Sequence, residues 1–312
     1  MHLLKNKLAI DFMGKRQIAL VLSGVMLVIA IGAIAMRGLN LGVDFTGGTL
    51  VEVGYPAAVD LESVRGALSG SELGQTQAQH FGSSREVLIR IAPQEGKASA
   101  QLSEDVLSAL HQQDPAVEMR RVEFVGPQVG EELTEQGALA MIYALIGILI
   151  YIMVRFQWRF APGAVIALVH DVLFIVGFFA LFQLDFDLTV LAALLAVIGY
   201  SLNDTIVVFD RIRENFRRMR KGTAVDVVNT SINQTLSRTL ITSFTTLLVV
   251  VSLFIFGGEV IHGFALALIL GVVVGTYSSI YVASTATLAL GVSKADLMPV
   301  RKEGEGQEES SV

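Results

Sequence analysis

Six long apolar runs constrain this chain more than any other feature. Each has about 20 residues, the length a helix needs to cross the roughly 30 Å hydrocarbon core of a bilayer. They occupy residues 17–36, 137–156, 162–182, 188–209, 240–256 and 263–288. Only 17% of the 312 residues are charged, well below the roughly 25% of a soluble domain. The sequence therefore predicts an α-helical membrane protein with six transmembrane helices.

Lysine and arginine are concentrated in alternate connections between these runs. They occur in residues 1–16, in the link after the second run and in the link after the fourth: Lys5, Lys7, Lys15, Arg16, Arg155, Arg159, Arg211, Arg213, Arg217, Arg218, Arg220 and Lys221. The short links "QLDFD" and "GGEVIH" have neither. Short basic loops stay in the cytoplasm. Both termini are therefore expected in the cytoplasm, with residues 37–136 on the outer side of the membrane.

The segment 37–136 has the pattern of a small soluble domain. Strands are expected at residues 49–55, 76–82, 85–92 and 117–126, and helices at 59–70 and 98–113. This βαββαβ order is typical of a ferredoxin-like α+β domain. About 100 residues are enough to bury a core of their own.

Two further segments carry charge outside the apolar runs. Residues 210–237 form a basic loop in which Ile212, Phe216 and Met219 recur at helical spacing. This pattern favours a helix lying on anionic headgroups, with docking on a partner's cytoplasmic face as the alternative. Residues 291–312 are acidic and without apolar periodicity, so a disordered cytoplasmic tail is expected.

Ionisable residues inside the apolar runs are the leading functional candidates. Each costs roughly 2.5–3.5 kcal/mol to insert and is seldom kept without a use. His170 and Asp171 lie in the third run, Asp204 in the fourth, and Arg238 opens the fifth. For His170 and Asp171, hydrogen bonding between helices is as good an explanation as a functional one.

The spacing around Asp204 and Arg238 suggests a proton relay. Tyr200 and Ser201 share a helical face with Asp204, and Arg238 heads a polar stripe of Thr242, Thr245 and Thr246. The fourth and fifth runs are consecutive and antiparallel, so Asp204 and Arg238 are expected at similar depth, where they could pair. A carboxylate facing a guanidinium can alternate between paired-ionised and unpaired-protonated states. The alternatives are snorkelling of Arg238 to the headgroups and a static hydrogen bond at Asp204.

Two glycine patterns complete the set of candidates. Gly271, Gly275 and Ser279 are four residues apart and predict close helix packing. Together with the intramembrane charges, they suggest that the chain needs helices of a partner. In "LNLGVDFTGGTLVEV", Asp44, Phe45, Gly47 and Gly48 follow the first run and predict a tight turn between span and domain.

Metal and enzyme chemistry have little support in the sequence. There is no cysteine, and the five histidines are scattered without an HExxH pair. No catalytic constellation is found in residues 37–136. We therefore expect no metal, no enzymatic activity and no cofactor, with protons as the coupling ion.

Four segments together resemble the SecF family of membrane subunits of the bacterial Sec protein translocase. They are "GLNLGVDFTGGT" at 38–49, "FVGPQVGEEL" at 124–133, "VIGYSLNDTIVVFDRIRENFR" at 197–217 and "QTLSRTLITSFTTLL" at 234–248. The resemblance extends from about residue 11 to residue 292, and the four motifs in combination are specific.

The resemblance implies half of a transporter of the resistance–nodulation–division architecture. Its expected partners are SecD as the other six-span half, the SecYEG channel, YajC, the unfolded polypeptide being exported and membrane lipids, with no nucleic acid. The implied function is to use the proton motive force in the late stage of protein export. By this resemblance Asp204 handles the proton, Arg238 is its cationic partner, and the turn at Asp44, Phe45, Gly47 and Gly48 sets the geometry that couples span to domain.

Two other functions remain open at this stage. Half of a small-molecule exporter of the same superfamily would need a drug-sized, aromatic-lined pocket in the external domain, and residues 37–136 have few aromatic side chains. A purely structural assembly subunit would have no need of a buried acid and base.

Overall fold

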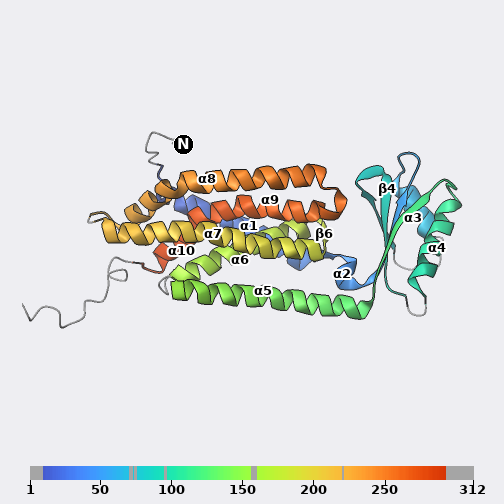
Figure 1. The fold of residues 1–312 in the computed structure, drawn as a ribbon, viewed down its shortest axis with the longest axis horizontal. Coiled ribbons are helices and arrows are strands. Elements are labelled where there is room, and N and C mark those ends of the chain that lie inside the picture. The colour runs from blue at the N-terminus through green and yellow to red at the C-terminus, as the bar shows by residue number, and fades with distance from the viewer. Residues whose placement is uncertain are drawn as a thin grey trace, which may run out of the picture.

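The computed structural model describes residues 10–69, 73, 76–94, 97–155, 160–219 and 221–292. A long bundle of helices lies on one side and a small α/β lobe lies beyond one end of it (Figure 1). Six helical segments of the described chain are long and apolar enough to cross a membrane: Met13–Arg37, Pro127–Arg155, Phe160–Phe182, Leu188–Arg218, Ala224–Phe256 and Glu259–Ala289. The predicted six spans are confirmed, and most extend further than their apolar runs.

The first five spans are continuous helices. After a short 3-10 turn at Met13–Lys15 they are α1 (Arg16–Arg37), α5 (Pro127–Arg155), α6 (Phe160–Phe182), α7 (Leu188–Arg218) and α8 (Ala224–Phe256). The last span is broken into a 3-10 turn at Glu259–Ile261, α9 (His262–Ser278), a π-helical turn at Ser279–Ala283 and α10 (Ser284–Ala289). Within the bundle, α7 packs extensively on α9, and α1 on α6.

The lobe between α1 and α5 has the predicted order of elements. These are β2 (Gly48–Gly54), α3 (Leu61–Ser69), β3 (Thr76–Phe81), β4 (Ser83–Ile91), α4 (Ser99–His111) and β5 (Glu118–Val125). The sheet order is β3-β4-β2-β5, and all three strand pairs are antiparallel. Alternate strand residues point to one face, so Val51 and Ile89 form a core with Leu68 and Val106 of the two helices.

A pair of two-residue strands links the segment after α1 to the connection between α6 and α7. β1 (Asn40–Leu41) pairs in parallel with β6 (Asp185–Phe186), and the short helix α2 (Val43–Thr46) follows β1. The sequence analysis predicted neither of these strands. Strands of two residues have too few positions to show a period, so only tertiary pairing reveals them.

The basic segment after the fourth span differs from its prediction. α7 has 31 residues and α8 has 33, which is about 46 and 50 Å of helix, longer than the roughly 30 Å bilayer core. Both helices continue beyond the span, and Ile212 and Phe216 are buried in a core with Val228 and Ile232 of α8. The predicted interfacial helix is therefore wrong, because the apolar stripe is covered by α8 instead of lipid.

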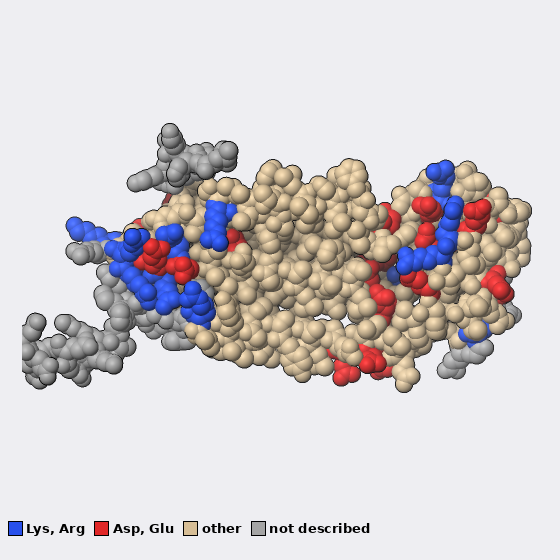
Figure 2. Space-filling model, in the orientation of Figure 1, with Lys and Arg blue, Asp and Glu red and all other residues tan. Residues whose placement is uncertain are grey.

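Charge is absent from the middle of the bundle on the face seen in Figure 2. Basic side chains gather at the end of the bundle opposite the lobe, and mixed charges lie on the lobe and its junction with the bundle. Arg211, Arg217 and Arg218 belong to the basic end. Four further basic residues of the connections, Lys5, Lys7, Arg159 and Arg220, lie outside the described residues, as does nearly all of the acidic tail.

Candidate functional site: a buried polar network between the membrane helices

Two carboxylates lie buried in the middle of the bundle. Asp171 is 1% exposed and Asp204 is 7% exposed. Along α6, Ala167 belongs to an apolar cluster at the basic end and Ile175 to another at the lobe end, with Asp171 between them. Along α7, Val197 and Val208 bracket Asp204 in the same way. The two acids therefore occupy a polar layer between two apolar cores.

Asp171 is held by three side chains. Its Oδ2 accepts hydrogen bonds from Ser201 at 2.6 Å and from Ser278 at 2.7 Å. Its Oδ1 lies 2.9 Å from Nδ1 of His170. Charged groups in such an interior are stabilised mainly by hydrogen bonds of this kind. Asp171 is thus linked to α7 by Ser201 and to the last span by Ser278.

Asp204 is held by hydroxyl groups of two other elements. Its Oδ1 accepts from Thr239 of α8 at 2.6 Å, and its Oδ2 accepts from Ser279 at 2.6 Å. Ser279 is the first residue of the π-helical turn, and such turns occur frequently at functional sites. Ser278, Ser279 and Thr239 are buried, so the network is sheltered within this chain.

A neighbouring group of hydroxyls extends the polar layer. Tyr200 donates to Ser243 at 3.2 Å, and Ser243 lies 2.7 Å from the hydroxyl of Thr276. The sequence analysis missed Thr239, Ser243, Thr276 and Ser278. A Ser/Thr-rich pattern on the fifth and sixth runs was the available signal, but hydroxyls are common in membrane helices and bond readily to their own backbone.

The predicted proton-relay residues are not all brought together. Tyr200 and Ser201 share a helix with Asp204, as predicted, but they donate to Ser243 and Asp171. Arg238 is exposed, and within the described residues its side chain forms no ion pair with Asp204. The expected direct pairing is therefore not present in this structure.

The rotation of α8 explains this difference. Its buried polar face is Thr235, Thr239 and Ser243, while Thr242 is exposed and donates to the carbonyl oxygens of Arg238 and Thr239 in its own helix. Both faces of α8 are rich in threonine, so the sequence could not tell which one packs inward. The guanidinium of Arg238 instead lines an open cavity of about 320 Å³ with Arg155, Asp210 and Arg211.

The small-residue face of the last span packs within the chain. A Cβ atom at Gly271 would lie 2.1 Å from Val197, and one at Gly275 would lie 3.1 Å from Ser201. Ser279 donates to Asp204. The glycine face and the two buried acids therefore have their contacts within this chain, because α7 covers the glycines and the chain's own hydroxyls bond the acids, whereas the intramembrane charge of Arg238 stays exposed.

The turn after the first span sits at the junction of bundle and lobe. Oδ2 of Asp44 accepts a hydrogen bond from the backbone nitrogen of Leu188 at 3.0 Å, at the first residue of α7. The ring of Phe45 packs near that of Phe186, with centroids 6.1 Å apart. Unpaired amides at a helix start are stabilised by such an acceptor. The motif thus contacts the helix that carries Asp204.

The glycine pair allows this turn. Gly47 has φ +67° and Gly48 has φ +128°, values that side-chain-bearing residues rarely adopt. A Cβ at Gly47 would lie 2.8 Å from Cα of Pro127, and one at Gly48 would lie 2.5 Å from the carbonyl oxygen of Ile91. The two glycines therefore allow the chain to turn from the bundle into β2 while it passes close to Pro127, the first residue of α5.

Asp185 connects the lobe to the bundle and was not predicted. Its carboxylate accepts from Asn40 and Gln79, both at 2.6 Å, and lies 3.3 Å from the guanidinium of Arg90. Gln79 and Arg90 belong to lobe strands, whereas Asp185 lies between α6 and α7. The lobe and the start of α7 are therefore in direct polar contact.

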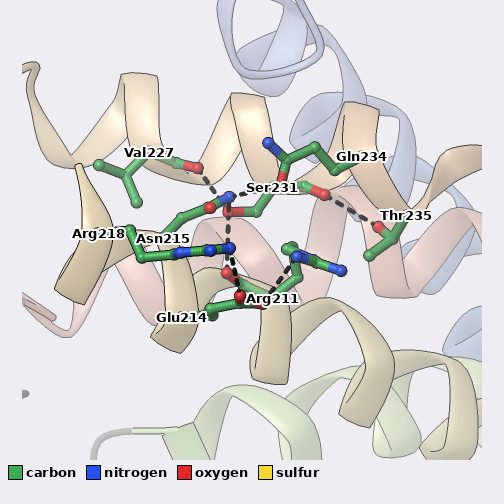
Figure 3. A network of polar contacts seen from close by, with 8 residues as sticks. All are labelled: Arg211, Glu214, Asn215, Arg218, Val227, Ser231, Gln234 and Thr235. Carbon is green, nitrogen blue, oxygen red and sulfur yellow. Dashed lines mark hydrogen bonds and ion pairs between the residues drawn. The ribbon is translucent and has the colours of Figure 1, made fainter.

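A second network ties α7 to α8 at the basic end (Figure 3). Asn215 donates to Ser231 and to Gln234, both at 2.9 Å. Arg211 and Arg218 both pair with Glu214 at 2.7 Å. Since Asn215 and Ser231 are buried, these contacts fix the register of the two helices where they leave the membrane. In the described part of the chain, no three His, Cys, Asp or Glu side chains are grouped to hold a metal.

Six spans, one lobe after the first span and a buried polar layer define a multi-pass membrane protein of the transporter type. Two family models match the chain: the C-terminal part of the protein export membrane proteins SecD and SecF over residues 105–293, and the SecD/SecF GG motif over residues 32–55. The chain belongs to the SecF family of protein translocase subunits, as the sequence motifs indicated.

Relatives and solved structures agree with this assignment. The protein translocase subunit SecF of Vibrio alginolyticus is 53% identical over 98% of each chain, and that of Escherichia coli O157:H7 is 46% identical over 97% of this chain and 94% of its own. The crystal structure of SecDF from Thermus thermophilus, described as a translocon-associated membrane protein, has 37% identity and a TM-score of 0.82. It covers 90% of this chain, which spans only 38% of that longer one.

Proposed function

We propose that this chain works with a SecD-type half and uses the proton motive force to drive the late stage of protein export through SecYEG, with YajC in the same assembly. The observation that carries the proposal is the position of Asp204, buried in the bundle and held by hydroxyls of α8 and the last span. A buried ionisable group of this kind in a membrane helix is most often part of an ion or proton pathway.

Protonation of Asp204 offers a way to convert the gradient into movement. The ionised carboxylate accepts from Thr239 and Ser279, whereas the protonated acid becomes a donor on one oxygen. The contacts between α7, α8 and the last span therefore differ in the two states. One charge crossing 100 mV is worth about 2.3 kcal/mol, enough to bias a two-state equilibrium by more than tenfold.

A second half of the transporter is part of this proposal. Arg238 faces outward beside an open cavity, where the helices of another subunit could cover it. The similarity to SecDF supports this arrangement, because that chain is far longer and only 38% of it corresponds to this one. In the assembled complex Arg238 is the cationic partner for a carboxylate of the proton path.

The distribution of charge supports the orientation that we propose. The basic end of the bundle in Figure 2 would face the cytoplasm together with both termini, and the lobe would face the periplasm. In this orientation the lobe can meet a polypeptide that emerges from the channel. The contacts of Asp185 and Asp44 then give the lobe a path to the start of α7.

The small-molecule exporter would need an apolar pocket in the lobe, whereas the apolar cavity of about 330 Å³ beside Phe45, Met141 and Phe186 lies against the helices of the bundle. The cavity of about 470 Å³ at the junction is lined by charged side chains that include Asp44, Arg90, Asp185 and Glu259. A drug-sized pocket is instead mainly apolar with few polar groups.

Substitution of Asp204 tests the proposal. Asp204→Asn keeps the shape of the protonated acid but cannot ionise, so export driven by the gradient should stop in inner-membrane vesicles that contain the whole translocase. Copurification with SecD should remain. Glu135→Gln is the matched control, an exposed acid on another long helix, α5, that does not line the cavity beside Arg238. Export by Asp204→Asn at the wild-type rate, still dependent on the gradient, would contradict the proposed role.

A further inference from the structure

The side chain of His170 has one ring nitrogen that meets no hydrogen-bond partner in the part of the chain that the structure describes. His170 is 3% exposed, and its Nδ1 contacts Asp171 at 2.9 Å. Its Nε2 is buried and has no hydrogen-bond partner among the described residues. A buried polar atom without a hydrogen-bond partner is costly in free energy, so its persistence calls for an explanation beyond packing.

The surroundings of Asp171 are suited to a negative charge. Three donors converge on the carboxylate, namely the hydroxyls of Ser201 and Ser278 and the Nδ1 group of His170. Hydrogen bonds to the charged form favour that form. With His170 neutral, the pair then carries one uncompensated negative charge in the bundle, and uptake of one proton cancels it.

We propose that His170 and Asp171 form a second proton-binding site, coupled to Asp204 through the consecutive residues Ser278 and Ser279. This inference rests on the proposed function and deepens it. With Nδ1–H donating to Asp171, the incoming proton binds at Nε2 of His170. The resulting imidazolium is balanced by the Asp171 carboxylate, and no other bond changes. Histidine is suited to this because its ring carries a proton on one nitrogen when neutral and on both nitrogens when charged.

The coupling to Asp204 follows from shared elements. Ser278 donates to Asp171 and Ser279 to Asp204, so a shift of the last span at its π-helical turn changes both carboxylates together. α7 also carries both Ser201, the second donor to Asp171, and Asp204 itself. The occupancy of one site therefore alters the hydrogen bonds available at the other.

Other ionisable groups near the pair are few among the described residues. Tyr277 lies with its ring 6.2 Å from that of His170, and its hydroxyl donates to the carbonyl of Ala19 in α1. Tyr281 lies beyond Tyr277. The remaining ionisable side chains on helices packed against α6 are Asp204, Tyr200, which donates to Ser243 of α8, exposed tyrosines of α5, or groups towards helix ends: Tyr143, Tyr151, Arg16, Arg37, Glu131, Glu132, Glu135, Arg155, Asp210, Arg211, Arg213, Glu214, Arg217, Arg218 and His262.

The pH profile of gradient-driven export tests the second site. The measurement uses the assembled translocase in vesicles, with the size of the gradient held constant as pH is varied. We expect two titrations in the wild-type profile. His170→Gln and Asp171→Asn should each remove one titration and leave the other. Ser278→Ala is the matched control, since it removes one hydrogen bond to Asp171 and keeps both ionisable groups, so its profile should shift without losing a titration.

A direct measurement on the wild-type complex keeps the test independent of folding defects. In bilayers with ¹⁵N-labelled histidine, the His170 signal, assigned by its absence in His170→Gln, should change from a neutral to a doubly protonated ring as pH falls. A ring that stays neutral, or a His170→Gln export profile that superimposes on the wild-type profile, overturns the second site alone. Failure of the proposed function would be seen in a different result, namely gradient-dependent export that persists in Asp204→Asn.

Discussion

Ser278 and Ser279 are neighbours in the chain, yet their hydroxyls donate to different carboxylates, Asp171 and Asp204, at 2.7 and 2.6 Å. Consecutive residues of a regular helix point about 100° apart, and the last span uses this divergence where its π-helical turn begins. One short segment thus connects Asp171 of α6 with Asp204 of α7, and Thr239 of α8 joins the same layer through Asp204.

The two serines should have separable effects. Ser279→Ala removes one of the two hydroxyl donors to Asp204, and a hydrogen bond to a charged group contributes about 1.5–3 kcal/mol. We expect gradient-driven export to fall by roughly tenfold or more, with assembly retained. Ser284→Ala is a suitable control, since Ser284 is also buried but donates to the backbone of Ser279. Equal activities of the two variants would argue against the role of Ser279.

The close approach of α9 to α7 predicts an asymmetry between two glycines. Gly271→Ala places a Cβ 2.1 Å from Val197, whereas a Cβ at Gly199 meets nothing within 4 Å. Overpacking costs about 1–3 kcal/mol, so Gly271→Ala should lower the melting temperature of the purified chain. Gly199→Ala should leave it unchanged or raise it, since alanine favours helix. A drop of the same size in both variants would show that the packing at Gly271 is not decisive.

Alanine substitutions at two glycines, Gly48 in the turn and Gly66 in α3, should change the stability of the lobe in opposite directions. Gly48→Ala should destabilise the lobe by about 1–3 kcal/mol, because φ is +128° there and a Cβ would lie 2.5 Å from the oxygen of Ile91. Gly66→Ala in α3 meets nothing within 4 Å and should stabilise by about 0.5–1 kcal/mol. Protease resistance of the lobe during urea titration measures both. Stabilisation by Gly48→Ala would disprove the strain argument.

Substitutions of Arg238 can show whether its guanidinium takes part in proton transport or only anchors the end of the helix. If it is the cationic partner in the assembled complex, Arg238→Met should abolish gradient-driven export. Arg238→Lys should retain part of it, because lysine keeps the charge but not the planar fork. If the side chain only snorkels to the headgroups, lysine should serve equally well. A wild-type export rate for Arg238→Lys would therefore favour simple anchoring.

The orientation can be measured directly, because the natural chain has no cysteine. Lys97→Cys in the lobe should react with a membrane-impermeant maleimide added outside spheroplasts. Arg218→Cys at the end of α7 should react only after the membrane is opened. The reverse labelling pattern would reject cytoplasmic termini and a periplasmic lobe.

Much of the architecture could be predicted from the sequence, because it depends on local properties. Length and apolarity of a run decide whether it can span a bilayer, and short-range periodicity separates the strands from the helices of the lobe. Asp171, Asp204 and Arg238 could be singled out for a related reason, since a charged residue within an apolar run is unusual wherever the helix faces. The motif at Asp44 and Gly48 also stood out as a local pattern.

Only the tertiary structure decided which of these groups meet. The rotation of α8 turns Thr239 inward and Arg238 outward, and the depth of the last span places Ser279 at Asp204. Both depend on contacts between residues far apart in the chain, such as Gly271 against Val197 and Asn215 with Ser231. The same reason explains why the stripe at Ile212 and Phe216 was assigned to lipid: a periodic apolar face shows that a helix is covered, whereas the three-dimensional packing determines what covers it.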